Sequence, residues 1–233
     1  MGRLDGKVAL ISGGLKNQGA AEAKLFTAEG AKVVFGDIAD EEGRAFEAEI
    51  KAAGGEANYM HLDVASAADW QAAVAHASER FGELDILINN AAILVPRVPV
   101  EERTEEEWDR VMAFNAKGVF LGTKTAILAM RNACGGSIVN ISSISGIGQT
   151  LTQEPAYAAS KGAIRVFSKV VATQHAKDKI GYNSVHPGPV DTAMFRTAFP
   201  TPEALDERLS RVPMKRAGSI DEVVQGVLFL ASD

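Results

Sequence analysis

The chain has 233 residues, with 24 Lys and Arg against 30 Asp and Glu, which gives a formal net charge of −6. Hydrophobic residues make up 46% and charged residues 23%, a mixture typical of globular domains that excludes a disordered tail or a fibrous repeat. The mildly acidic balance argues against nucleic-acid binding, which needs a clustered basic surface.

Short runs rich in β-branched residues alternate with longer stretches of helical spacing along the chain. Strands are predicted at residues 7–12, 32–35, 57–62, 84–89, 137–141 and 181–185. Helices are predicted at residues 20–29, 41–53, 69–81 and 105–130. The strands are mostly apolar throughout, which favours burial on both faces of a parallel sheet. The sequence therefore predicts one α/β domain over residues 1–233, a doubly wound parallel sheet of the Rossmann type with helices on both faces.

Local signals add detail to this plan. Three pairs of residues have the spacing of a capping box at a helix start: Ser66 with Asp69, Thr104 with Glu107, and Ser219 with Glu222. Residues 93–103 and 187–202 lack regular patterning. Loops that follow the carboxyl ends of strands commonly bind ligands in doubly wound sheets. We expect a substrate loop or lid over approximately residues 187–215.

The sequence also bears on the cellular compartment of the protein and on whether it has a membrane segment. One cysteine, Cys134, is too few for an internal disulfide, as is typical of proteins in a reducing compartment. Residues 1–7 lack the apolar core of a secretion signal. The longest uncharged stretch, residues 132–153, is too rich in Gly, Ser, Asn and Gln to cross a bilayer. We expect a cytoplasmic protein without a membrane segment.

The first predicted strand runs into a glycine-rich turn, residues 12–19, which is followed by a helix. Glycines such as Gly13 and Gly19 permit a tight turn and let the backbone approach a pyrophosphate at the helix N-terminus. Asp37 ends the second strand, at about the separation expected for a carboxylate that binds the adenine ribose. The two features favour a dinucleotide site. A P-loop is excluded because no Gly-Lys-Ser/Thr follows the turn, while a methyltransferase remains an alternative at this point.

Tyr157 and Lys161 lie four residues apart at the start of a predicted helix, so their side chains share a face. A nearby ammonium group favours the phenolate, and we expect Lys161 to lower the pKa of Tyr157. Taken alone, the pair is more often an ordinary helix contact, with Tyr half-buried and Lys solvated.

Several motifs in order resemble the short-chain dehydrogenase/reductase family over nearly the whole chain, and bacterial alcohol and hydroxysteroid dehydrogenases most of all. They are the Gly13–Gly19 turn, Asp63-Val64, Asn89-Asn90-Ala91-Ala92, Asn115, Ser142-Ser143, Tyr157 with Lys161, and His186-Pro187-Gly188. The resemblance implies a nicotinamide-dependent oxidoreductase that interconverts a secondary alcohol and a ketone. It also implies a small-molecule substrate and a homo-oligomer, normally a tetramer that pairs the long helices around Asn115 and Tyr157.

The resemblance also implies roles for individual residues. Tyr157 would exchange a proton with the substrate oxygen, and Ser143 would hydrogen-bond that oxygen. Lys161 would hold the nicotinamide ribose, and Asn115 would anchor a water that relays protons. The full set of implied cofactor-binding residues is Gly13, Asn17, Gln18, Gly19, Asp37, Ile38, Asp63, Val64, Asn89, Ala91, Tyr157, Lys161, Pro187, Gly188, Val190 and Thr192.

Two residues near the expected adenine ribose bear on the choice between NAD and NADP. Asp37 would accept the ribose hydroxyls and repel a 2′-phosphate, which favours NAD. Lys16 stands where NADP-using relatives often carry a basic residue. Direct repulsion by a carboxylate in a poorly screened site outweighs one exposed cation, so we expect NAD, with NADP less favoured.

The chain departs from the family pattern in four places. Asn17 replaces the middle glycine of the turn, and Ala92 replaces a glycine. The Ser143–Tyr157 separation is one residue longer than usual. The chain given stops at Asp233, before a last strand that the family normally has, and we expect that residues are missing there. The first two changes support one alternative from another class, a non-catalytic dinucleotide-binding regulator or scaffold on the same fold.

The apolar content of the two irregular segments favours a hydrophobic substrate, with cyclic or steroid-like compounds as candidates. The residues are Ile93, Leu94, Val95, Ile147, Leu151, Met194, Phe195 and Phe199, which serve equally well as core or lid packing. No metal site is expected, because the four histidines lack ligand spacing and one cysteine cannot form a thiolate cage.

Overall fold

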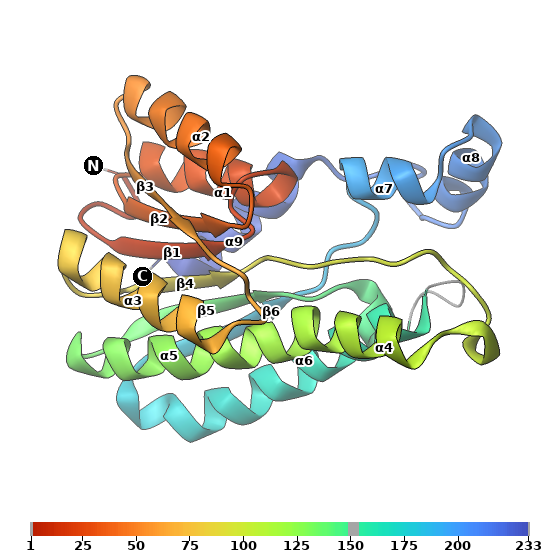
Figure 1. The fold of residues 1–233 in the computed structure, drawn as a ribbon. Coiled ribbons are helices and arrows are strands. Elements are labelled where there is room, and N and C mark those ends of the chain that lie inside the picture. The colour runs from red at the N-terminus through yellow and green to blue at the C-terminus, as the bar shows by residue number, and fades with distance from the viewer. Residues whose placement is uncertain (1, 149–153, 233) are drawn as a thin grey trace.

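The computed structural model describes residues 2–148 and 154–232. These residues form a six-stranded parallel sheet of order β3-β2-β1-β4-β5-β6 (Figure 1). The strands are β1 (Val8–Ser12), β2 (Lys32–Asp37), β3 (Glu56–His61), β4 (Ile86–Asn89), β5 (Gly136–Ile141) and β6 (Ile180–Val185). The strand order reverses between β1 and β4, and in doubly wound sheets such a switch point is where ligands bind, outside the carboxyl ends of the strands.

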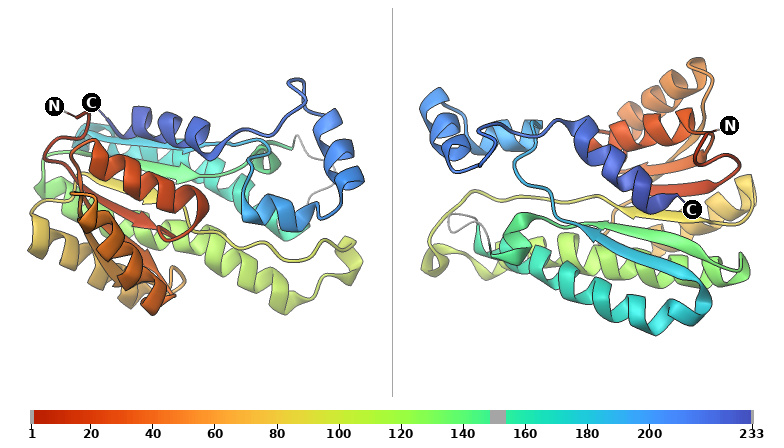
Figure 2. Two further views of the ribbon diagram at one scale, coloured as in Figure 1. Left: turned by 90° about the horizontal axis from the view of Figure 1, so that it is seen from above. Right: turned by 180° about the vertical axis from the view of Figure 1, so that it is seen from behind.

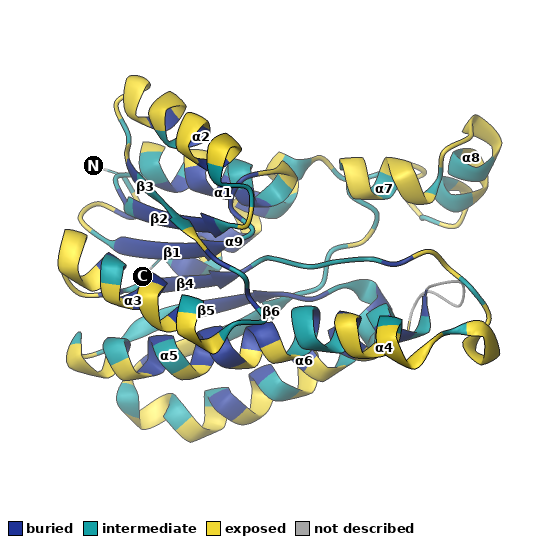
Figure 3. Cartoon of the chain, viewed as in Figure 1, coloured by how far each residue is buried: buried dark blue, intermediate teal, exposed yellow. Residues whose placement is uncertain are grey.

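Helices cover both faces of the sheet (Figures 1 and 2). One face carries α1 (Asn17–Ala28), α2 (Asp40–Ala52) and α9 (Ile220–Ala231). The other carries α3 (Ala67–Phe81), α5 (Gly118–Asn132) and α6 (Pro155–His175). Two short helices, α7 (Ala193–Ala198) and α8 (Pro202–Ser210), project beyond the carboxyl ends of the strands. They are largely exposed (Figure 3).

Further short elements complete the chain. The helix α4 (Glu105–Val111) continues into α5 through a π-helical turn, η2 (Met112–Lys117). Three 3₁₀ turns, η1 (Val100–Glu102), η3 (Ile144–Ile147) and η4 (Ala176–Asp178), lie in connections.

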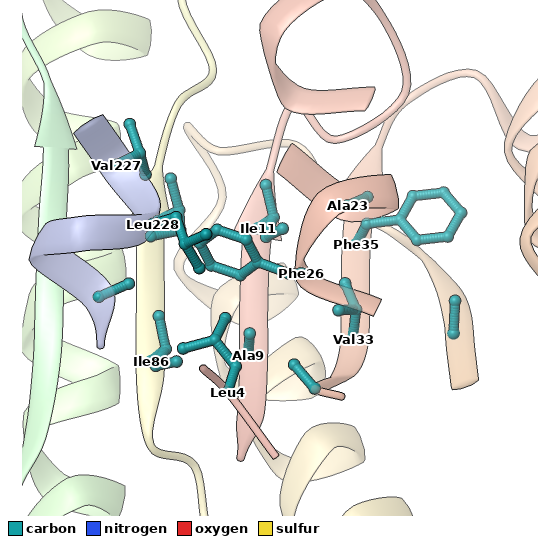
Figure 4. Packing of buried hydrophobic residues seen from close by; sticks show 14 of the residues in the cluster. Leu4, Ala9, Ile11, Ala23, Phe26, Val33, Phe35, Ile86, Val227 and Leu228 are labelled. Carbon is teal, nitrogen blue, oxygen red and sulfur yellow. The ribbon is translucent and has the colours of Figure 1, made fainter. Parts of the chain in front are cut away.

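The core has two layers because successive side chains of a strand point to opposite faces. In β1, Ala9 and Ile11 lie in one cluster with Phe26 of α1 and Leu228 of α9 (Figure 4). Leu10 lies in the opposite cluster, which contains Trp70 of α3. Strands such as β1, which is buried at every position, thus supply both layers, and the fold class predicted from the sequence is confirmed.

The six predicted strands are present, with ends within two residues of the prediction. The predicted helix over residues 105–130 is interrupted by the π-helical turn. The expectation that residues 187–202 are irregular is wrong for α7. This helix begins with Thr192, whose Oγ accepts the N–H of Phe195 at 3.2 Å, and the N–H of Ala193 donates to Oδ1 of Asn17 at 3.2 Å. A contact between residues so far apart in sequence leaves no local pattern.

Of the three predicted capping boxes, the one made by Ser219 and Glu222 is complete. Ser66 and Thr104 each accept a backbone N–H, so both cap their helices. The carboxylates that should complete those two boxes bind elsewhere: Asp69 accepts the N–H of Asp63, and Glu107 pairs with Arg103.

Glu22 is an ionisable residue inside the apolar core. It lies in α1, its side chain is fully buried, and Nε2 of Gln18 donates to its Oε1 at 2.9 Å. Its Oε2 has no hydrogen-bond partner among the described residues. Burial disfavours the charged carboxylate and raises the pKa of Glu22 to about 8, against a smaller opposing effect of Gln18.

Replacement of Glu22 should therefore change how stability depends on pH. The folded protein holds a proton that the unfolded chain releases near pH 4.3, so ionisation lowers the free energy of unfolding as pH rises through about 4.3 to 8. Glu22→Gln should remove this loss, to an upper limit of about 5 kcal/mol, at about 1.4 kcal/mol per pKa unit. Urea denaturation at about pH 5 and about pH 8.5 measures the difference. Glu79→Gln, on the exposed side of α3, is the matched control; parallel pH curves for Glu22→Gln and wild type would contradict the prediction.

Candidate active site

The carboxyl ends of β1 and β4 are held together by Ser12 and Asn90. The Oγ of Ser12 is buried and accepts the N–H groups of Asn90 and Ala91 at 3.2 and 3.3 Å. In return, Nδ2 of Asn90 donates to the carbonyls of Ser12 and Gly13 at 3.2 and 3.0 Å. These bonds close the seam at the switch point and place the Gly13–Gly19 turn beside the segment that follows β4.

The turn after β1 has the backbone that a close approach to a ligand needs. Gly13 has a φ of +62°, and a Cβ there would lie 2.8 Å from Cα of Ala91. A Cβ on Gly19 would lie 2.1 Å from the carbonyl oxygen of Gly13. Asn17, which replaces a family glycine, has a φ of +49° and begins α1. Asn tolerates this left-handed conformation better than most residues, so the turn keeps its shape.

Asp37 is the last residue of β2, and Ile38 follows it directly. Oδ1 of Asp37 accepts the N–H of Ile38 at 2.8 Å, and the Ile38 side chain is exposed. Nearby, Nζ of Lys16 forms an exposed ion pair with Glu42 at 2.7 Å. The hydrogen bond that Lys16 donates to Glu42 is the main reason that the pKa of Lys16 is raised, with a smaller attraction from Asp37. The cation at the edge of the turn is thus already paired.

Three further predicted cofactor residues, Asp63, Val64 and Asn89, lie at or just after the ends of β3 and β4. Two of them have buried side chains. The side chains of Val64 and Asn89 are buried, and Nδ2 of Asn89 donates to Oδ1 of Asn140 at 2.8 Å. The carbonyl of Val64 accepts Nε1–H of Trp70 at 3.0 Å. Asp63 is only partly buried, and its Oδ1 accepts the N–H of Ala65 at 2.9 Å.

Ser143, Tyr157 and Lys161 come together past the end of β5. The hydroxyl group of Ser143 lies near that of Tyr157 and donates to Oγ of Ser145 at 3.1 Å. Nζ of Lys161 lies 5.6 Å from the centroid of the Tyr157 ring and donates to the carbonyl of Ile141 at 2.7 Å. Oγ of Ser142 donates to the carbonyl of Lys161 at 2.8 Å, which holds α6 against the end of β5. The arrangement presents two adjacent hydroxyl groups with an ammonium group one helical turn away.

Burial shifts the pKa values of two side chains in this cluster, Tyr157 and Lys161. Burial raises the pKa of Tyr157, and the nearby hydroxyl group of Ser143 opposes the shift. Burial also lowers the pKa of Lys161 to about 7. The lowered pKa of Tyr157 is expected from Lys161 together with the positive charge of an oxidised nicotinamide, so it stays a prediction for the protein with its cofactor. Lys161 is buried and Tyr157 partly buried, and the ammonium group is bonded to a carbonyl rather than to the phenol.

Asn115 lies in the π-helical turn and is fully buried. Its Oδ1 accepts the N–H of Ile93 at 2.8 Å, and its Nδ2 donates to the carbonyl of Ile93 at 3.0 Å and to Oγ of Ser160 at 3.1 Å. Oγ of Ser160 in turn donates to the carbonyl of Tyr157 at 2.8 Å. Asn115 thereby joins the segment after β4 to the first turn of α6.

The segment after β6 lies against the same end of the sheet. The carbonyl of Pro187 accepts the N–H of Ile144 at 3.1 Å. Past Gly188, Val190 forms an isolated parallel bridge with Gly218, and Thr192 caps α7. The segment therefore connects the Ser143 loop to α7, and α7 to the glycine turn through Asn17.

Sequence reasoning missed the structural roles of Ser12 and Ser160. Ser12 stands directly before the first glycine of the turn, and Ser160 directly before Lys161. A small hydroxyl residue at a strand end or inside a helix is a weak signal by itself, because its partner is set by the tertiary fold. Leu151, one of the predicted apolar residues, lies outside the described residues, as do its neighbours in residues 149–153 of the longer loop between Ser143 and Tyr157.

Residues 2–148 and 154–232 contain neither a cluster of metal-ligating side chains nor a helix that could cross a membrane. No group of three or more His, Cys, Asp or Glu side chains there could hold a metal ion. Within the same part of the chain, no helix is both long and apolar enough to cross a membrane.

Comparison with known proteins decides the family. The family model described as "Enoyl-(Acyl carrier protein) reductase" matches residues 15–233. The chain belongs to the short-chain dehydrogenase/reductase family. This short-chain dehydrogenase/reductase is 43% identical over 231 residues to 2,5-dichloro-2,5-cyclohexadiene-1,4-diol dehydrogenase LinX of Sphingobium indicum, which covers 99% of this chain and 91% of that protein.

Two further comparisons agree. The short-chain dehydrogenase/reductase is 44% identical over 232 residues to the 3-alpha-(or 20-beta)-hydroxysteroid dehydrogenase of Mycobacterium tuberculosis, covering 100% of this chain and 85% of that protein. The crystal structure of levodione reductase superposes with a TM-score of 0.94 at 32% identity, covering 99% of this chain and 92% of that one. The predicted resemblance is confirmed. The protein is an oxidoreductase of this family that acts on hydroxyl groups of small molecules, with a nicotinamide dinucleotide as cofactor.

Proposed function

We propose that the protein is an NAD-dependent oxidoreductase that interconverts a secondary alcohol and a ketone, with Tyr157 as the acid/base. The observation that carries the proposal is the grouping of the Ser143 and Tyr157 hydroxyl groups with buried Lys161, whose Nζ lies 5.6 Å from the centroid of the Tyr157 ring. A substrate oxygen that meets both hydroxyl groups can exchange a proton with one and accept a hydrogen bond from the other.

The residues of the glycine turn fit a bound dinucleotide. Gly13 and Asn17 have left-handed backbone, and Gly19 lies too close to the carbonyl of Gly13 to carry a Cβ. The turn is therefore tight enough for the start of α1 to approach a pyrophosphate. Asp37 at the end of β2 is suited to accept the ribose hydroxyls. When bound, the nicotinamide supplies the hydride acceptor in alcohol oxidation and the hydride donor in ketone reduction.

In the oxidation direction, the phenolate oxygen of Tyr157 takes the proton of the alcohol hydroxyl group. The hydroxyl of Ser143 donates a hydrogen bond to the substrate oxygen and stabilises the negative charge that develops there. Lys161, whose pKa burial lowers to about 7, would gain charge when it binds the ribose hydroxyls and would then favour the phenolate. In this proposal, Asn115 holds the first turn of α6 and the substrate-facing segment at Ile93 in register.

A ring-containing secondary alcohol is the substrate class that we propose. Val95 is buried in a small apolar cluster next to Ala156, the neighbour of Tyr157, and partly buried Ile93 packs against it. In α7 and directly after it, the rings of Phe195 and Phe199 pair at 5.1 Å. Apolar side chains of this kind suit a carbon ring with one polar oxygen. The cyclohexadienediol and hydroxysteroid named for two relatives are ring compounds.

The central test replaces the proposed acid/base. Tyr157→Phe should lower kcat for the best substrate of a panel of cyclic and open-chain alcohols by about 10²–10⁴-fold, because it removes proton transfer and leaves the ring in place. NADH absorbance measures the rate. Tyr182→Phe, a substitution in β6 of a tyrosine whose hydroxyl is bonded to Thr123, is the matched control and should retain turnover. If wild type turns over no member of the panel, or Tyr157→Phe keeps the full rate, the proposal is wrong.

We propose NAD rather than NADP because of the charges at the end of β2. The carboxylate of Asp37 would face a 2′-phosphate, while the nearest cation, Lys16, is already paired with Glu42 at 2.7 Å. One like-charge contact about 4 Å long contributes about 4 kcal/mol of repulsion in a partly screened site.

The cofactor preference can be measured directly. Wild type should have a much higher kcat/KM with NAD than with NADP. Asp37→Asn should raise the kcat/KM for NADP relative to NAD at least about tenfold, because it removes the repelling charge. Asp221→Asn, an exposed carboxylate at the start of α9, should leave the ratio unchanged. Equal use of the two cofactors by wild type would overturn the assignment.

We also propose a homo-oligomer, normally a tetramer, in which α5 and α6 face a second copy. Large apolar side chains are exposed on the outer faces of both helices: Phe120 and Leu128 on α5, and Val166 and Val170 on α6. Exposed apolar side chains of this kind commonly mark a contact with another subunit.

We also propose that the protein is located in the cytoplasm, because its exposed Cys134 is not in a disulfide. Cell fractionation tests this location.

The oligomer should depend on the α5–α6 surface. Val166→Glu should shift the sedimentation coefficient toward that of a 24.7 kDa monomer, because a carboxylate would be buried against an apolar face. Met214→Glu, at a side chain of similar exposure outside this surface, should not. A monomeric wild type would refute the proposal.

A further inference from the structure

A buried cluster of charges lies behind the first turn of α6, apart from the residues assigned above. Glu154 is the N-cap of α6 and its side chain is 1% exposed. Its carboxylate accepts the N–H of Ala156 at 3.0 Å and the N–H of Tyr157 at 2.6 Å. The helix that presents the proposed acid/base thus begins on a buried carboxylate that is bonded to the backbone of Tyr157 itself.

Arg103 supplies the opposite charge. Its side chain is 3% exposed, and its Nε lies 3.0 Å from Oε1 of Glu154. Its Nη1 lies 2.7 Å from Oε2 of Glu107 in α4, and its Nη2 donates to the carbonyl of Pro96. One guanidinium group therefore contacts three parts of the chain: α6, α4 and the segment after β4.

The same segment is also tied to α6 at its other end. There Asn115 binds both backbone groups of Ile93 and the hydroxyl of Ser160. Between the two ties, Val95 packs with Ala156. The segment of residues 93–103 is thus held against the first turn of α6 by a buried side chain at each end. Figure 1 shows this segment running from β4 out to α4, which lies beside the start of α6.

Burial makes the ion pair sensitive to the loss of either partner. A charge taken out of water is unfavourable unless it is paired and hydrogen-bonded. If Arg103 is removed, the carboxylate of Glu154 stays buried without its cation, and it can regain solvation only by moving away from the helix start. Because the N–H of Tyr157 is bonded to that carboxylate, such a movement would displace Tyr157.

We propose that Arg103 and Glu154 are positioning residues, a buried clamp that fixes Tyr157 relative to the substrate-facing segment of residues 93–103. The proposal rests on the function proposed above for its effect on turnover. Its structural part concerns the helix start alone and can be tested without any substrate.

The first experiment measures amide hydrogen exchange of the start of α6 in the full-length protein. The N–H groups of a first helical turn have no partner within the helix, so their protection depends on the cap. Arg103→Met, which retains an apolar stem, should speed exchange in peptides that contain Ala156 and Tyr157 about tenfold or more, with no change in the strands of the sheet. Arg131→Met, which removes an exposed ion pair with Asp178 and a contact with His175 at the far end of α6, is the matched control and should change nothing at the start of α6. Unchanged exchange at the start of α6, or equal acceleration everywhere, would overturn the clamp.

The second experiment separates positioning from loss of fold. Arg103→Met should lower kcat about 10–100-fold while the Kd for NADH and the KM for the alcohol stay within about threefold, because displacement of the acid/base affects the reacting geometry most. Combining it with Glu154→Gln removes both buried charges and keeps an acceptor for the helix N–H groups, so kcat should recover at least about fivefold over Arg103→Met alone. Retention of the wild-type kcat in Arg103→Met, or a double variant no better than the single one, would overturn the proposal. An inactive wild type with the predicted exchange pattern would refute the proposed function and leave the clamp supported.

Discussion

The fold depends on how two strands that part from each other are kept in register. After β1 the chain turns toward the face that carries α1, and after β4 it turns toward α4 and the opposite face. Ser12 and Asn90 join the two strands where they part, through two N–H groups bound to one buried hydroxyl and one side-chain amide bound to two carbonyls. Since a buried backbone group must find a partner, this seam both satisfies the strand ends and sets where the two loops begin.

Every segment of the candidate site is placed relative to that seam. The glycine turn lies against Ala91, α7 is bonded to Asn17 of the turn, and the segment after β4 is bonded to α6. The contacts therefore run from the glycine turn to Tyr157 without leaving the carboxyl end of the sheet. Because the bonds of Ser12 and Asn90 fix where the loops begin, the loops can lack regular secondary structure and still be held in one arrangement.

Buried charge is distributed unevenly across the molecule. The layers above and below the strands are almost wholly apolar, whereas Lys161, Arg103 and Glu154 are buried around the first turns of α6. Each such group is unfavourable in a low-dielectric interior unless a partner compensates for lost solvation. Lys161 has one protein carbonyl, and burial lowers its pKa to about 7, so its charge depends on what binds beside it. Such groups concentrate where a protein needs reactivity rather than stability.

Local sequence determined which segments became strands, because the apolar runs could be buried only between two layers of helices. It also determined the left-handed turn at Asn17, since few residues other than glycine tolerate that backbone. The predicted grouping of Ser143, Tyr157 and Lys161 relied on the family motifs. Their side chains are together in the structure, whereas their catalytic roles remain predictions. What only the tertiary structure decided are the properties that depend on partners far along the chain. The helix α7 depends on Asn17, the raised pKa of Tyr157 on how deeply it is buried, and the ion pair of Arg103 with Glu154 on the docking of α4 against α6. Periodicity and propensity describe neighbours within a few residues, whereas desolvation and ion pairing depend on which distant atoms replace water.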